Sequence, residues 1–138
     1  MLYYATLYIC TALIFLALDF IWLGFIANNF YMNALGDLMK EEVNFKIAAG
    51  FYLMYAVGIV IFVVHPALEA NDWKHALLYG ALFGFFCYAT YDMTNMATLK
   101  DWPTQVSIVD MAWGTFVTAF SATSGFFVSR YIVNNFIS

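Results

Sequence analysis

The chain has 138 residues, of which 64% are hydrophobic and only 10% are charged. Soluble domains carry about 25% charged residues, so a soluble protein of this size could not bury so much apolar surface. The formal net charge is −4, and no basic run points to a nucleic-acid partner. The signature motifs of soluble enzymes are also absent from the sequence. The composition therefore predicts an integral membrane protein.

Four apolar stretches are long enough to cross a membrane as helices, since a helical span needs about 20 mainly apolar residues. They cover residues 2–27, 45–64, 75–96 and 104–133. Pro66 is expected to end the second helix, and Pro103 to begin the fourth. Because short connections make neighbouring helices antiparallel, we predict an all-α fold. It is one transmembrane domain, residues 1–138, folded as a four-helix bundle in up-down-up-down order.

The segments outside the spans add little about orientation. The longest connection, residues 28–44, mixes aromatic, apolar and charged residues, which is typical of a short helix lying in the membrane interface. The N-terminal stretch has no basic residue before its apolar run, so we expect a retained first helix rather than a signal peptide. Basic residues are divided evenly between the two sides, and the sequence does not predict which side faces the cytoplasm.

Small residues and thiols inside the spans have ordinary structural interpretations. Gly80 and Gly84 form a small-xxx-small pair that lets membrane helices approach closely. Cys10 and Cys87 are expected to be buried free thiols, because their spacing suits neither a disulfide nor a metal site. No metal and no cofactor are expected.

Three aspartates are expected at one depth in the membrane. Asp19 and Asp92 come shortly before the ends of the first and third helices, and Asp110 shortly after the start of the fourth. In an antiparallel bundle these ends share one side, which places all three within about 6–12 Å of the same surface. Intramembrane ionisable residues usually face a bundle interior or a water-filled cavity. The pattern predicts a pocket open to one side, although Asp19 could instead face a neighbouring subunit.

The residues around these aspartates repeat at helical spacing. DFIWLG (19–24) and DMAWG (110–114) each place a tryptophan three residues after the aspartate, and DMTN places an asparagine likewise. Each such pair lies on one helical face. The second helix enters at this depth with tyrosines. We predict a pocket lined by Asp19, Trp22, Tyr52, Tyr55, Tyr91, Asp92, Asn95, Asp110 and Trp113.

Three carboxylates in one poorly solvated site cannot all be ionised without compensation. No Lys or Arg lies within the spans at that depth. The remaining solutions are protonation, a shared proton, a bound cation, or hydrogen bonds from Tyr and Trp donors. A purely structural role for the aspartates also stays open, since polar contacts between membrane helices are modest but real.

The string YDMTNMATLKDWP, with LDFIWLGFIANNFY upstream and VDMAWGTF downstream, resembles a family of small bacterial membrane proteins. This is the domain-of-unknown-function family two-one-seven-seven. The residues that carry the resemblance are Tyr91, Asp92, Thr94, Asn95, Ala97, Thr98, Lys100, Trp102 and Pro103. The resemblance covers nearly the whole chain and implies a multi-pass protein of the bacterial inner membrane. It supplies no reaction.

The function expected from these residues is binding or transport of a proton, a small cation or an organic cation. Carboxylates would supply the charge, and aromatic faces would supply cation–π contacts. One alternative is a membrane-embedded enzyme acting on a lipid or other apolar substrate, with Asp92 and Asp110 as catalytic acid and base. Another is an accessory subunit held to its complex by these polar groups. The lipid bilayer is the expected partner, and a homo-oligomer is compatible with the small size.

Overall fold

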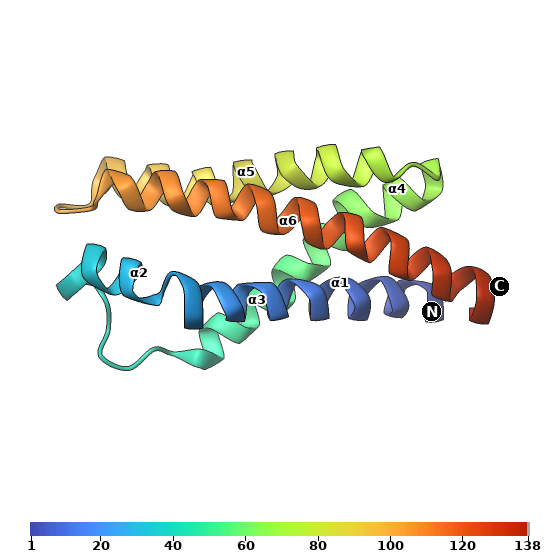
Figure 1. Ribbon diagram of the computed structural model, residues 1–138, viewed down its shortest axis with the longest axis horizontal. Coiled ribbons are helices and arrows are strands. Elements are labelled where there is room, and N and C mark those ends of the chain that lie inside the picture. Colours follow the sequence, from blue (N-terminus) through green and yellow to red (C-terminus); the bar gives the residue numbers. More distant parts are fainter. Residues whose placement is uncertain (138) are drawn as a thin grey trace.

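The computed structural model describes residues 1–137, so Ser138, the last residue of the predicted domain, lies outside the described part. All regular elements of that part are helical, as predicted. This part contains six α-helices and four short π-helical or 3₁₀ segments (Figure 1). In chain order the elements are α1 (Leu2–Ile21), η1 (Trp22–Ile26), α2 (Asn28–Leu35), η2 (Gly36–Leu38), α3 (Phe45–Ile59), η3 (Val60–Val64), α4 (His65–Ala70), α5 (Trp73–Thr98), α6 (Thr104–Ile132) and η4 (Val133–Ile137).

Within residues 1–137, three helical runs are long and apolar enough to cross a membrane: Leu2–Ile26, Phe45–Ala70 and Thr104–Ile137. The third predicted span corresponds to α5, which has 26 residues but is not among these three. Charged and polar residues at both ends of α5 shorten its apolar stretch below the length of about 20 residues that a span requires.

Polar residues define where two of the long helices begin. The side chain of Asn44 accepts a hydrogen bond from the Ile47 backbone N–H at 3.2 Å, which caps α3. Asp72 accepts from the Lys74 N–H at 3.0 Å and caps α5. Each bond satisfies a backbone donor that the first helical turn leaves free. The fourth long helix begins directly after Pro103, as predicted.

The prediction that Pro66 ends the second helix is wrong. The helical run that begins at Phe45 continues through the π-helical turn η3 and through Pro66 to Ala70. Inside this run Pro66 leaves the backbone ladder without one N–H donor, and the π-helical turn η3 directly before it changes the hydrogen-bond register at that point. The run ends at Asn71, whose φ of 51° places it in the left-handed region.

The helices α5 and α6 lie side by side because glycines line their contact (Figure 1). A methyl group added at Gly84 would overlap the Gly114 carbonyl oxygen, and one added at Gly114 would overlap the Tyr88 ring. At Gly80 the added carbon would lie 3.0 Å from the Ala119 Cα. The predicted role of Gly80 and Gly84 in close helix approach is confirmed.

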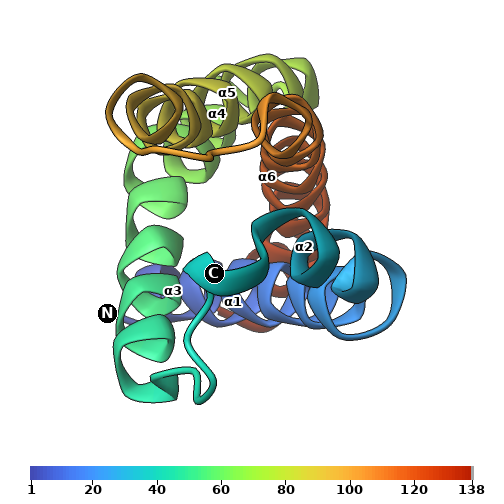
Figure 2. The same ribbon diagram turned by 90° about the vertical axis from the view of Figure 1, so that its left-hand side faces the viewer.

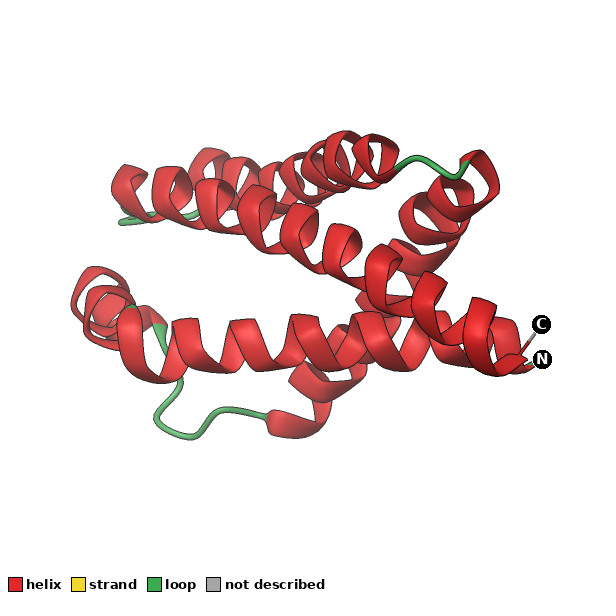
Figure 3. Cartoon of the chain, turned by 45° about the vertical axis from the view of Figure 1, so that its right-hand side comes forward, coloured by secondary structure: helices red, strands yellow, loops and turns green. Residues whose placement is uncertain are grey.

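The helix α1 meets α6 near the chain termini, which lie at the same end of the molecule (Figure 1). From that end the two helices diverge, and α2 lies across the far end of α1 (Figure 3). An end-on view shows α3 slanting from the level of α1 to that of α5, opposite α6 (Figure 2). The buried core between these helices includes Leu7, Phe15, Tyr55, Ile59, Val63, Val117 and Phe126.

Candidate functional site

The three aspartates lie on three helices near the end of the molecule where α2 is found. Asp19 belongs to the last turn of α1, and its side chain is only 4% exposed. Asp92 lies in the C-terminal part of α5 and is completely buried, and Asp110 lies in the second turn of α6 and is partly buried. The three carboxyl groups influence one another electrostatically, Asp110 acting on both Asp19 and Asp92.

The two Asp–Trp motifs pair with each other rather than within themselves. The indole N–H of Trp113 donates to the Asp19 carboxylate at 3.0 Å, so the tryptophan of one motif binds the aspartate of the other. The Trp22 and Trp113 rings stack with centroids 4.4 Å apart and planes 6° from parallel. Spacing of three residues places each tryptophan on the helical face of its own aspartate, whereas the hydrogen bonds run from Trp113 to Asp19 and from Trp22 to the Tyr31 hydroxyl.

Tyr31 joins α2 to this cluster. Its hydroxyl donates to the Asp110 carboxylate at 2.8 Å and accepts from the Trp22 indole N–H at 3.2 Å. Burial, and next the charge of Asp110, raises the pKa of the Tyr31 phenol above its usual value. The phenol therefore keeps its proton and remains a donor to Asp110. Trp22, Tyr31 and Asp110 form one hydrogen-bonded chain, and the indole stack connects that chain to Asp19.

Asp92 has a different environment. Neither of its carboxyl oxygens has a hydrogen-bond partner among residues 1–137, although both are buried. Asp110 is the carboxyl group that acts on it. Its backbone carbonyl, in contrast, accepts a 3.0 Å hydrogen bond from the Ser107 hydroxyl, which accepts one from the Trp102 indole at 2.9 Å. Trp102, expected at the membrane interface, thus helps to hold the backbone beside Asp92.

The other predicted lining residues differ in whether they contact the aspartates. Tyr52 is half-buried and interacts with the Asp19 carboxylate. Tyr55 is buried deeper, and its hydroxyl pairs with that of Thr118 at 2.9 Å. Tyr91 is exposed and packs edge-on against Trp102. The Asn95 side chain is half-exposed and forms no hydrogen bond with the aspartates in the described part of the chain.

Two tyrosines of the site were not predicted from the sequence. Tyr88 precedes Asp92 by four residues on α5, so helical spacing could have placed it on the same face; its ring covers Gly114 of α6. Tyr31 carries no such signal, because it reaches Asp110 only through the way α2 folds back. Local periodicity does not encode that turn.

No basic side chain neutralises the site. Within residues 1–137, no Lys or Arg forms an ion pair with any of the three aspartates. The same residues contain no group of three His, Cys, Asp or Glu side chains placed to hold a metal ion. An apolar groove between η3 and α5, and a cavity at the opposite end of the molecule, are lined by other residues.

The sequence of residues 4–127 matches the family described as predicted membrane protein, DUF2177. The chain belongs to this family. The matched region includes all three aspartates, both stacked tryptophans and Tyr31. No curated protein and no solved structure matches the chain. Membership in DUF2177 establishes a membrane protein and leaves the activity to be argued from the site.

Proposed function

We propose that this chain is a proton-binding membrane transport protein whose working group is the Asp92–Asp110 carboxyl pair. The observation that carries the proposal is the environment of Asp92, which is fully buried and whose carboxyl group interacts, within residues 1–137, only with the neighbouring carboxyl group of Asp110. Two neighbouring carboxyl groups away from water cannot both be ionised without a counter-charge. A proton held between them supplies that charge, and its loss or gain changes the electrostatic energy of the site strongly.

The proposal includes four membrane crossings. The additional crossing is α5, which is not among the three runs that qualify as spans by length and hydropathy. Intramembrane carboxyls are costly and are usually retained for proton or ion pathways. With α5 in the bilayer beside α6, Asp92 and Asp110 lie within the membrane near one surface. The protein is then a multi-pass component of the bacterial inner membrane, and α2 rests in the interface.

Two observations favour a proton over the other ligands considered. A metal ion needs several oxygen or nitrogen ligands, and no suitable group of three occurs in residues 1–137. An organic cation needs a free aromatic face, whereas Trp22 and Trp113 cover one face of each other and direct their N–H groups to Tyr31 and Asp19. The complete burial of Asp92 also disfavours a catalytic role on a lipid substrate, since a general acid must reach the group it protonates.

Proton flux into vesicles tests this function. The purified protein is reconstituted into vesicles that enclose a pH-sensitive dye, and a membrane potential drives proton entry. We expect acidification with the unaltered protein and its loss in Asp92→Asn and in Asp110→Asn. Asp37→Asn is the matched control, because Asp37 is exposed and lies outside the cluster.

Infrared spectroscopy adds a direct readout of the proton. A protonated carboxylic acid has a C=O stretching band that the carboxylate lacks, and we expect this band to disappear in Asp92→Asn. Equal flux in Asp92→Asn and the unaltered protein, or no flux in either, would overturn the transport proposal. A stoichiometric protein partner that is lost in Asp92→Asn, with no flux at all, would instead support the accessory-subunit alternative.

A further inference from the structure

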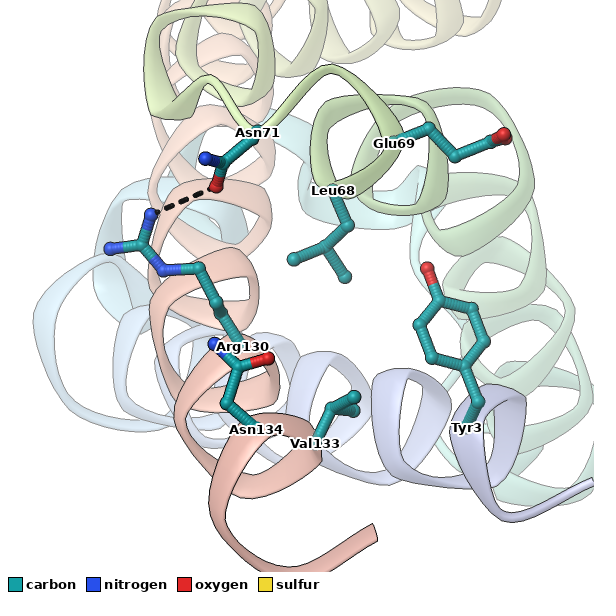
Figure 4. Close-up of a pocket in the computed structure, with 7 residues that line it drawn as sticks. All are labelled: Tyr3, Leu68, Glu69, Asn71, Arg130, Val133 and Asn134. Atoms are coloured by element: carbon teal, nitrogen blue, oxygen red, sulfur yellow. Dashed lines mark hydrogen bonds between the residues drawn. The ribbon is translucent and has the colours of Figure 1, made fainter. Parts of the chain in front are cut away.

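A second site lies at the opposite end of the molecule, where the three candidate spans come together. A cavity of about 460 Å³ opens there. Tyr3 at the start of the first span, Glu69 at the end of the second and Arg130 near the end of the third line it (Figure 4). Ligand sites commonly have volumes of about 300–1,000 Å³. None of the residues that line this cavity belongs to the aspartate cluster.

One wall of the cavity carries a positioned positive charge. The guanidinium of Arg130 lies 4.9 Å from the Phe126 ring centroid and 5.3 Å from that of Phe127. Its Nη1 donates to the Asn71 side-chain oxygen at 3.3 Å. Asn71 is held in the left-handed turn between α4 and α5. Aromatic rings and an amide thus orient the guanidinium, whose planar geometry suits phosphate oxygens.

The opposite wall carries a positioned negative charge. Oε1 of Glu69 pairs with His65 Nε2 at 2.8 Å, one helical turn earlier on α4. The other ring nitrogen of His65 lies 2.9 Å from the Tyr3 hydroxyl. A single histidine tautomer satisfies both contacts, with Nε2–H donating to Glu69 and Nδ1 accepting from Tyr3. The Glu69 side chain remains 68% exposed, so it can still receive a ligand.

The two charges do not form an ion pair with each other, although both line the same cavity. Leu68 points into the cavity from α4 and Val133 lines it from η4, so part of its surface is apolar (Figure 4). A ligand that satisfies both walls needs an acidic group for Arg130 and an ammonium group for Glu69. The cavity lies at the ends of the membrane spans, which is the level of lipid headgroups.

We propose that this cavity binds a zwitterionic ammonium–phosphate group, such as the headgroup of an ethanolamine phospholipid. The phosphate contacts Arg130, the ammonium contacts Glu69, and the glycerol end lies over Leu68 and Val133. Free phosphoethanolamine has the same charged groups, so the lipid and the soluble molecule are two sources of one chemistry. The proposal does not depend on proton transport at the aspartate cluster.

Thermal stability of the purified full chain in detergent tests this site with four probes. They are short-chain phosphatidylethanolamine, short-chain phosphatidylglycerol, phosphoethanolamine and inorganic phosphate. A ligand that binds only the folded state raises the melting temperature, and at equal concentration the tighter ligand raises it more, because the stabilisation follows RT ln(1 + L/Kd), where L is the free ligand concentration. We expect the ethanolamine lipid to raise it more than the glycerol lipid at equal concentration. Arg130→Gln should weaken ethanolamine-lipid binding about tenfold or more, because a charge-assisted pair is lost.

Glu69→Gln separates headgroup recognition from folding. It should abolish the preference for the ethanolamine over the glycerol headgroup while phosphate-dependent binding remains. Lys74→Gln removes an exposed basic residue at the same end of the molecule but outside the cavity, and this variant should bind like the unaltered protein. An equal response to phosphoethanolamine and to the lipid would support the site with the soluble molecule as its source. Equal binding of both lipids by the unaltered protein, or retained binding in Arg130→Gln, would overturn the proposal.

Discussion

Asp19 and Asp92 illustrate two ways in which one protein buries a carboxyl group. Asp19 is nearly inaccessible but accepts a hydrogen bond from Trp113. Asp92 is fully inaccessible and has none on its side chain within residues 1–137. Removing the donor of a buried acceptor lowers the free energy of unfolding by about 1–3 kcal/mol. A buried polar group without a donor destabilises the unaltered protein, so removing that group need not lower the stability further. The two positions should therefore respond differently to substitution.

Trp113→Phe should lower the free energy of unfolding by about 1–3 kcal/mol, because it leaves the Asp19 carboxylate without its donor. Asp92→Leu should destabilise the protein less than Trp113→Phe, or not at all, since the apolar side chain removes the cost of burying a carboxyl together with its contact to Asp110. Chemical denaturation in detergent measures both. Trp73→Phe is the control, because Trp73 is an exposed indole outside the site. A loss in Asp92→Leu as large as that in Trp113→Phe would show that Asp92 is held by interactions of its own.

The sequence predicts residues of the site only where their spacing along a single helix decides which face they share. Spacing along α1 and α6 predicts that Asp19 shares a helical face with Trp22, and Asp110 with Trp113. It does not predict that Trp113 binds Asp19 or that Trp22 stacks on Trp113, because those contacts depend on how the two helices cross. Tyr31 was missed for the same reason: its contact with Asp110 joins residues 79 positions apart.

At the scale of elements, the close approach of α5 and α6 sets the distance between Asp92 and Asp110. The glycines Gly80, Gly84 and Gly114 allow that approach, and their small-residue pattern is visible in the sequence. The continuation of the second helix through Pro66 is less predictable, since a proline usually marks the end of a helix. Here the π-helical turn η3 directly precedes Pro66 and changes the hydrogen-bond register where the N–H donor is missing, so the run continues.

Gly84→Ala should separate α5 from α6 and destabilise the protein by about 1–3 kcal/mol, the usual cost of overpacking. The added methyl group would overlap the backbone of Gly114, which cannot move like the end of a side chain. Gly50→Ala on α3 is the matched control, because nothing lies within 4 Å of its added carbon. It should be neutral or slightly stabilising, since alanine favours a helix over glycine. Melting curves of the two variants compare them directly, and equal curves would contradict close packing at Gly84.

At the scale of the whole molecule, the positions of the chain termini bear on the number of membrane crossings. Three runs qualify as spans by length and hydropathy, and both termini lie at the same end of the fold. An even number of crossings puts the termini on one side of the membrane, whereas three crossings put them on opposite sides. The fold therefore favours α5 as a fourth crossing despite its polar ends.

Labelling of single cysteines tests that topology. Asp72→Cys and Asp101→Cys, each made in a background without Cys10 and Cys87, place a thiol in the turns before and after α5. We expect a membrane-impermeant maleimide to label these two thiols from opposite sides, and N- and C-terminal tags to be accessible from the same side. Labelling of both turns from one side would exclude a crossing by α5. It would also mean that Asp92 does not lie on a membrane-spanning helix.

The stacked indoles of Trp22 and Trp113 also give the protein an optical signal of its own. Two parallel chromophores 4.4 Å apart couple their electronic transitions, which splits the circular dichroism of their strong ultraviolet bands into a pair of opposite sign. One ring belongs to the turn that ends α1 and the other to α6. Any movement that separates these helices at the aspartate end weakens the coupling at once. Conformational changes of this protein can therefore be followed without an attached label.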